Sequence, residues 1–166
     1  MDAFMTAAGE GPASWFLQNH MTIKATAAMT GGAFGLVESW IAPGASPPLH
    51  VHHREDEAFY VLAGEITFLY GERTFGAGPG SFVFLPRDVP HTFVVESDEP
   101  AHVLTLLTPG GAEAIFIEGG RPAERAGLPP ATPPDIPRLR QVALDFGNEI
   151  VGPPIAPRRR ADAAAG

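Results

Sequence analysis

Residues 44–64 read GASPPLHVHHREDEAFYVLAG, and this stretch is the most informative feature of the chain. It contains His50 and His52, and Glu57 follows five residues after the second histidine. A further histidine, His91, lies in a second segment that is punctuated by glycine and proline. Three imidazoles and a carboxylate form a mixed nitrogen and oxygen donor set that suits a divalent transition metal.

Strand geometry explains the spacing of these residues. His50 and His52 are two residues apart, so on a β-strand they point to the same face, with Cα atoms about 7 Å apart. A polar, turn-like stretch separates them from Glu57, which begins an apolar run. If the chain reverses there, Glu57 lies on the neighbouring strand and faces the same interior. Gly64 ends the run at a tight turn that needs a positive φ.

Two motifs carry a resemblance to a known family. The first stretch resembles the first motif of the cupin superfamily at every defining position: Gly44, His50, His52, Glu57 and Gly64. The second segment, GSFVFLPRDVPHTFVV, resembles the second cupin motif through Gly80, Pro86 and His91. Asp88 and Val95 replace the usual glycine and asparagine there, and neither change removes a metal ligand. Asp88 can still adopt a turn conformation with φ above zero.

Short apolar runs alternate with glycine and proline along most of the chain, and these runs predict β-strands. The predicted strands cover residues 21–27, 35–41, 49–52, 57–63, 65–70, 73–77, 81–85, 91–95 and 102–107. Many short strands at this spacing favour a sandwich or a barrel. The resemblance implies an all-β cupin fold, a double-stranded β-helix or jelly roll. The first motif occurs once, so we expect a single-domain cupin, or monocupin.

The last third of the chain differs in composition. We expect a cupin β-barrel domain over residues 1–126, with a short helix at 112–117. A proline-rich extension follows over residues 127–157, with a short helix at 136–146. Asp135 is the predicted cap of that helix, and the proline at its second position is tolerated there. We expect a disordered tail over residues 158–166. The extension could close the barrel mouth or pack on its outside.

Composition limits the classes of function. A chain of 166 residues with 45% hydrophobic residues is typical of one globular domain. The absence of cysteine excludes disulfides and thiolate metal sites. A formal net charge of −8 argues against a nucleic-acid partner, which would need a basic surface. No apolar run has membrane-spanning length, and the N-terminus lacks a signal-peptide pattern, so we expect a cytoplasmic protein.

Other ionisable residues near the motifs have less specific roles. His53 follows a predicted ligand directly, so strand alternation turns it away from the site. We expect His20 to be structural or exposed, and His102 to lie either near the site or at the surface. Glu55 and Asp56 are expected to be solvated turn residues. Either could replace the glutamate ligand only if its strand began earlier.

Aromatic and aliphatic residues predict a substrate pocket. Phe59 and Val61 have the same strand parity as the glutamate ligand, and Phe93 has the same parity as the third histidine. Phe68 on the next strand is also expected to face the interior. These four residues are the predicted pocket, although most could be ordinary core residues. An apolar pocket with a metal at its base suits a planar aromatic or polyketide-like substrate, because the core strands contain no cluster of arginine and lysine.

The composition of one predicted strand indicates that two copies of the chain associate. Residues 81–85 place Phe82 and Phe84 on one face and Val83 and Leu85 on the other, so this strand has no polar face. We expect one face to be buried in the barrel and the other in a partner subunit. The sequence therefore predicts a homodimer.

The donor set predicts a catalytic metal. Three imidazoles and a carboxylate leave one or two coordination positions open, which distinguishes a catalytic site from a structural one. Ni, Fe, Mn, Co, Cu and Zn all accept these ligands. Such a metal can act as a Lewis acid on a hydroxyl or enolate oxygen of the substrate. Glu57 can serve as both ligand and general base.

A narrower resemblance suggests the reaction. The stretches 15–17, 32–38, 49–57, 101–109 and 114–116 are similar to single-domain cupins of the quercetin 2,3-dioxygenase type. In that family the residues that match His50, His52, Glu57 and His91 bind the metal, and the glutamate assists flavonol deprotonation. This implies a metal-dependent dioxygenase that uses O2 on a flavonol or a related enolisable aromatic or polyketide-like molecule. The alternatives are a non-oxidative polyketide cyclase and a non-catalytic cupin that binds a small molecule.

Overall fold

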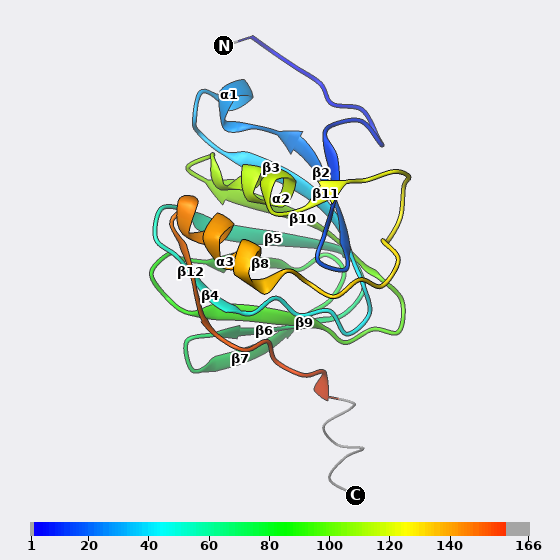
Figure 1. Ribbon diagram of the computed structural model, residues 1–166, viewed down its shortest axis with the longest axis vertical. Helices are drawn as coiled ribbons and strands as arrows, with labels where there is room; N and C mark the ends of the chain where they lie inside the picture. Colours follow the sequence, from blue (N-terminus) through cyan, green and yellow to red (C-terminus); the bar gives the residue numbers. More distant parts are fainter. Residues whose placement is uncertain (1, 159–166) are drawn as a thin grey trace, which may run out of the picture.

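The computed structural model describes residues 2–158, which form two antiparallel sheets and a few short helices. In order across the first sheet, the strands are β11 (Arg121–Pro122), β1 (Ala13–Phe16), β2 (Asn19–Ala25), β3 (Gly35–Ile41), β10 (Ala101–Thr108), β5 (Asp56–Ala63) and β8 (Phe82–Leu85). Across the second sheet they are β12 (Asn148–Gly152), β4 (Leu49–His52), β9 (His91–Val95), β6 (Ile66–Tyr70) and β7 (Arg73–Ala77). Figure 1 shows the two groups of strands as an upper and a lower layer. The predicted all-β jelly roll is confirmed.

The nine predicted strands correspond to β2 through β10. The first prediction ran too far, because a helical turn, α1 (Ala27–Thr30), begins where it was expected to continue. The hydroxyl of Thr26 caps this turn by accepting a hydrogen bond from the Met29 amide at 3.3 Å. Gly31 ends it with a φ of +62°.

Two of the predicted turns depend on positive φ angles. Gly64 has a φ of +89°, and a Cβ atom there would lie 2.8 Å from the Cα of Ala101. Only glycine therefore fits between β5 and β6. Asp88, which replaces the usual glycine of the second motif, has a φ of +64°. The expectation that aspartate can adopt this turn is confirmed.

The C-terminal extension is part of the folded structure. After a 3₁₀ turn (Ala112–Ala114) and α2 (Ile115–Glu118), the chain reaches α3 (Ile136–Asp145). The Asp135 side chain caps α3 by accepting from the Arg138 amide at 3.1 Å, as the sequence predicts. The strand β12, which the sequence did not predict, then pairs with β4. The expected tail lies outside the described residues except for Arg158.

Helix α3 shows how the C-terminal extension packs against the rest of the molecule. Its buried residues are Leu139 and Ala143, and both line a cavity between the two sheets. In Figure 1, α3 lies in front of the strands. The extension therefore closes one side of the jelly roll and does not pack on its outside.

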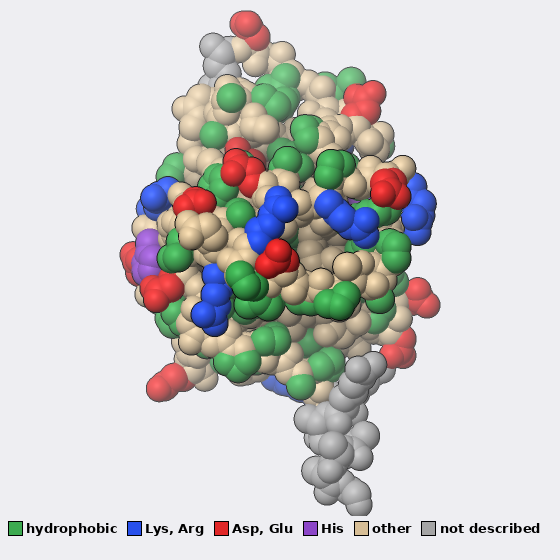
Figure 2. Space-filling model, viewed as in Figure 1, with side chains coloured by type: hydrophobic (Ala, Val, Ile, Leu, Met, Phe, Trp, Pro, Cys, Tyr) green, Lys and Arg blue, Asp and Glu red, His purple; other side chains and the backbone are tan. Residues whose placement is uncertain are grey.

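The outer face of the first sheet carries exposed apolar side chains. Phe82 and Phe84 on β8 are 65% and 51% exposed, and Tyr60 and Leu62 on the neighbouring β5 are 43% and 40% exposed. The expected burial of this face against a partner subunit stays a prediction. The face in Figure 2 mixes positive and negative side chains without a broad basic patch. No helix among the described residues is long and apolar enough to span a membrane.

Candidate metal centre

Four side chains from three strands meet inside the jelly roll. His50 and His52 lie on β4, Glu57 on β5 and His91 on β9, and one donor atom from each lies within 4.8 Å of all the others. Strand alternation gives the two histidines of β4 a common face. His91 is directly opposite His50 in the antiparallel pair of β4 and β9, which explains the 4.6 Å between their ring centroids. His52, Glu57 and His91 are buried, and His50 is partly buried.

Hydrogen bonds orient the three imidazoles. The Nδ1 atoms of His50 and His91 lie 2.8 Å and 3.0 Å from the carbonyl oxygens of Pro48 and Val89. A carbonyl oxygen only accepts, so Nδ1 carries a proton in both rings, and Nε2 is the nitrogen that could hold a metal. His52 Nδ1 lies 2.5 Å from the Glu55 carboxylate.

The remaining nitrogen of each ring faces the centre of the cluster. The Nε2 atoms of His91 and His52 lie 3.2 Å and 3.7 Å from Oε2 of Glu57. His52 Nε2 is buried and has no hydrogen-bond partner among the described residues. A buried, unpaired ring nitrogen beside two further imidazoles and a carboxylate fits a divalent transition metal.

The predicted solvent exposure of Glu55 is wrong. This residue was expected to be solvated, but it is 2% exposed, and its carboxylate contacts the ring of His52. Its neighbour Asp56 is also not freely solvated, because it pairs with the Arg87 guanidinium at 3.0 Å. The local sequence looks like a polar turn, and only the packing of that turn against β4 buries the first of these carboxylates.

The remaining histidines lie outside the cluster. His53, the residue after β4, is exposed, pairs with Asp88 at 2.8 Å and is not part of the cluster, as predicted. His102 bonds Glu38 at 2.8 Å and stacks on Trp40, with ring centroids 4.0 Å apart, on the outer face of the sheet. His20 is buried.

Burial and neighbouring charges set the ionisation of the cluster. Burial, together with the nearby imidazoles of His52 and His91, lowers the pKa of His50 to about 3, so this ring is neutral at pH 7. Burial raises the pKa of Glu57, but its hydrogen bond with His91 and the charges of the imidazoles outweigh this effect and hold the pKa at about 2. Burial lowers the pKa of His52, but Glu55 and Glu57 together raise it above its ordinary value. These carboxylates create a negative environment that favours a bound cation.

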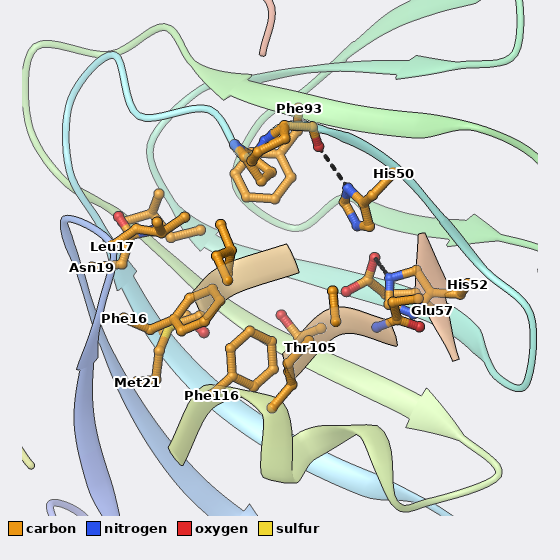
Figure 3. A pocket seen from close by; sticks show the side chains of 18 of the residues that line it. Phe16, Leu17, Asn19, Met21, His50, His52, Glu57, Phe93, Thr105 and Phe116 are labelled. Atoms are coloured by element: carbon orange, nitrogen blue, oxygen red, sulfur yellow. Dashed lines mark hydrogen bonds and ion pairs between the residues drawn. The ribbon is translucent and has the colours of Figure 1, made fainter. Parts of the chain in front are cut away.

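A mostly apolar cavity opens beside the cluster (Figure 3). Its volume is about 100 Å³, and His50, His52 and Glu57 form part of its wall. Its apolar wall contains Phe16, Leu17, Met21, Ile41, Phe59, Phe93, Ile115, Phe116, Leu139, Ala143 and Ile150. No lysine or arginine of the described chain lines it. The cavity therefore suits an uncharged, mostly apolar molecule better than a phosphate or a dicarboxylate.

Two of the four predicted pocket residues line this cavity and two do not. Phe59 and Phe93 are in its wall. Val61 and Phe68 are fully buried in the hydrophobic core between the sheets. They face the interior, as strand parity predicts, but they lie farther along their strands than the cavity extends. Parity alone gives the face of a side chain and not its depth in the jelly roll.

A second, outer cavity adjoins the first one. Its volume is about 280 Å³, and it shares Leu17, Asn19, Pro48 and Leu139 with the inner cavity. The proline-rich segment contributes Thr132 and Pro134 to its wall. A molecule longer than one ring could therefore occupy both spaces, with Leu17 and Leu139 at the boundary.

Comparisons with known proteins agree with this geometry. Residues 38–107 match the family model described as "Cupin domain", and this range contains all four candidate ligands. A comparison with curated proteins gave no match.

Solved structures share the fold. KdgF from Halomonas sp. is 19% identical with a TM-score of 0.58, and the match covers 67% of this chain and 96% of that one. An RmlC-like cupin from Shewanella frigidimarina is 17% identical with a TM-score of 0.56, covering 66% and 93%. A predicted oxalate decarboxylase from Thermotoga maritima is 19% identical with a TM-score of 0.57, covering 64% and 99%. At these identities the likeness concerns the fold alone.

Proposed function

We propose that this chain, whose residues 38–107 match the cupin domain, is a metal-dependent enzyme acting on a small, mostly apolar molecule. The observation that carries this proposal is the cluster of His50, His52, Glu57 and His91 at the wall of an apolar cavity. The substrate that we propose presents an enolic or phenolic oxygen to this cluster.

The four residues of the cluster would hold one divalent ion of Ni, Fe, Mn, Co, Cu or Zn. When bound, the metal supplies a Lewis acid that lowers the pKa of a substrate hydroxyl. Glu57 is ionised, and a carboxylate has two oxygens, so one can hold the metal while the other accepts the proton of that hydroxyl. The apolar side chains around the cavity exclude water from the ionised substrate.

The finer proposal is a dioxygenase that uses O2 on a flavonol or a related enolisable aromatic or polyketide-like molecule. The apolar wall and the absence of lysine and arginine among its described residues support a neutral aromatic substrate. The substrate ring system would lie along the inner cavity, and a larger substituent would extend past Leu17 and Leu139 into the outer cavity.

Oxygen uptake tests this proposal. The protein is loaded separately with Ni, Co, Mn and Fe, its metal content is measured, and quercetin is added in an oxygen electrode. We expect uptake with at least one metal, and none with a Glu57→Ala variant whose metal content is matched as closely as loading allows. Full metal content with no uptake for any metal would reject the flavonol dioxygenase. Substrate conversion under strict anaerobiosis would instead favour a cyclase, and binding without conversion would favour a non-catalytic binder.

We also propose that two copies of the chain form a homodimer through the outer face of β8. Phe82 and Phe84 are large, apolar and more than half exposed, and β8 is an edge strand of its sheet. Burial of such side chains is a main driving force of association between subunits.

A further inference from the structure

Besides Nε2 of His52, two buried polar atoms in the cavity wall lack a hydrogen-bond partner among the described residues. Ser39 is 1% exposed and Asn148 is 3% exposed, and both line the inner cavity. Within the described chain, neither the hydroxyl of Ser39 nor Oδ1 of Asn148 is hydrogen-bonded. Most buried polar atoms in folded proteins are paired, because an unpaired one costs the free energy of its lost hydration. Two further unpaired atoms in one mostly apolar wall therefore need an explanation.

Asn148 lies at the metal end of the cavity. It is directly opposite His52 in the antiparallel pair of β12 and β4. Opposite residues on one face of such a pair have Cβ atoms about 4.5–5.5 Å apart. Because both side chains are buried and line the cavity, the amide of Asn148 is a direct neighbour of a candidate metal ligand.

Ser39 lies at the other end. Across the first sheet, Glu57 is opposite Leu107, which is opposite Gly35 on β3. Ser39 is four residues farther along β3, or about 13 Å in the strand direction. Its partner on the adjacent strand is Met21. Figure 3 shows Met21 on the opposite side of the cavity from His52 and Glu57.

The wall between these two ends is mostly apolar, although Thr105 also lines it. Phe59 and Phe93 are in T-shaped contact, with ring centroids 5.6 Å apart, and both face the cavity together with Phe116. These rings can stack on an aromatic molecule but offer it no strong hydrogen bond. The cavity therefore has a polar point at each end and a mostly apolar middle.

We propose that Asn148 and Ser39 are specificity-determining residues that bind polar groups at the two ends of one substrate. Asn148 binds the group next to the oxygen that reaches the metal, and Ser39 binds a hydroxyl or carbonyl at the far end. The substrate class is a flat, mostly apolar ring system with oxygen functions at both ends. This inference rests on the proposed function, because that function places a substrate oxygen at the metal.

The chain offers a matched control for each residue. Ser14 is also 1% exposed and lies on a strand of the same sheet, but its hydroxyl donates to the Phe116 carbonyl at 2.7 Å. Asn19 is 6% exposed, and its Oδ1 accepts from the Ala42 amide at 3.1 Å. Each pair thus compares an unpaired side chain with a paired one of the same type.

Thermal unfolding of the metal-free, ligand-free protein gives the first readout. Ser39→Ala and Asn148→Ala should leave Tm unchanged or raise it, because they remove an unpaired polar group. Ser14→Ala and Asn19→Ala should lower Tm by about 2–6 °C, since each leaves a backbone group without its partner. If the two proposed variants lower Tm as much as their controls, Ser39 and Asn148 are structural and the inference is wrong.

Probe binding gives the second readout. Metal-loaded protein is titrated under anaerobic conditions with 3-hydroxyflavone and with 3,4′-dihydroxyflavone, which differ by one hydroxyl at the far end. The wild type should bind the dihydroxy compound about 3- to 10-fold more tightly. Ser39→Ala should abolish this difference, and Ser14→Ala should keep it. Asn148→Ala should weaken the binding of both compounds by a similar factor.

The two readouts separate the failure of the inference from that of the proposed function. A preference that survives Ser39→Ala, or Asn148→Ala binding that equals the wild type, would overturn the role of that residue. If the metal loads but the wild type binds neither flavone, the flavonol form of the proposed function fails. The Tm comparison then decides the inference alone, since it needs neither metal nor substrate.

Discussion

Residues 38–107 and the segments on either side of them build different parts of the same cavity. The central range supplies every candidate metal ligand. The flanking segments supply most of the apolar wall: Phe16, Leu17 and Met21 before it, and Ile115, Phe116, Leu139, Ala143 and Ile150 after it. The metal chemistry and the shape of the substrate space are therefore encoded in separate parts of the sequence.

The metal centre and the cavity wall differ in how precisely their side chains must be placed. A metal centre needs its donor atoms within a few tenths of an ångström, and neighbouring strands give that accuracy. A cavity wall needs apolar volume, which helices and loops can supply with many side chains. Substitutions in one region should therefore leave the property of the other region largely intact.

The largest effect is expected from a ligand in the central region. His91→Ala should reduce metal affinity by more than about a hundredfold, beyond the effect typical of residues that only contact a ligand. Chelator competition with measured metal content checks this. If His91→Ala binds metal as tightly as the wild type, His91 is not a ligand.

A substitution in a flanking segment should lower the free energy of unfolding without changing metal affinity. Leu139→Ala removes a buried side chain of α3 from the cavity wall, and it should lower the free energy of unfolding by about 2–5 kcal/mol. Urea unfolding measures this, with Leu144→Ala as the control, because Leu144 is 57% exposed on the same helix. A large loss of metal affinity in the folded Leu139→Ala protein would contradict the separation of the two regions.

Glu55 tests how far the metal region extends beyond its ligands. Glu55→Ala removes the carboxylate that orients the ring of His52, and metal affinity should fall about 10- to 100-fold. Glu55→Gln keeps an acceptor oxygen and should recover part of that loss. The exposed Glu72→Gln is the control. Equal affinities for Glu55→Ala and the wild type would show that this contact does not orient the ligand.

A smaller effect is expected in the way the stability of the metal-free protein depends on pH. Below pH 6.5 the unfolded chain binds a proton at His50 that the folded chain does not, because its folded pKa is about 3. Stability should therefore fall toward acid by up to about 1.4 kcal/mol per pH unit, and Glu57 adds a similar loss below pH 4.5. The raised pKa of His52 has the opposite sign: its contribution is lost as pH rises above 6.5.

These titrations predict a maximum of stability near pH 6.5, measured by urea unfolding across pH. Leu139→Ala should lower the whole curve without moving its maximum, since Leu139 carries no charge. A maximum that moves with Leu139→Ala would mean that the flanking region controls the ionisation of the cluster.

Substitutions on the outer face of β8 should affect neither the metal centre nor the cavity wall. Phe84→Ser should convert a dimer to a monomer in light scattering and leave metal affinity within about twofold, because Phe84 is 51% exposed and points away from the cavity. A wild-type mass equal to one chain at micromolar concentration would reject the dimer.

Local sequence signals predict the fold well because most strands are bounded by glycine or proline. The α3 helix is predicted to within one residue, since Asp135 caps it and Pro137 fits its first turn. The strand β12 is missed because it is short and follows directly from a helix stop, and only its pairing with β4 makes it a strand. Whether residues 148–152 form a strand depends on β4, which lies far away in the sequence.

The same distinction applies to the site. The spacing of His50, His52 and Glu57 is a local property, so the sequence predicts the cluster. The burial of Glu55 and the unpaired oxygen of Asn148 depend on contacts between distant segments. No pattern around either residue distinguishes it from an ordinary surface position. Sequence reasoning therefore found the metal region and missed most of the cavity wall.

The pairing of β12 with β4 has a consequence for biosynthesis. The strand that carries His50 and His52 is made early in translation, and the strand that covers its edge is among the last described segments to be made. Until then β4 presents an open edge, which can pair with other chains. Nascent or C-terminally shortened chains should thus be the aggregation-prone species during expression, even though their metal-binding motif is complete.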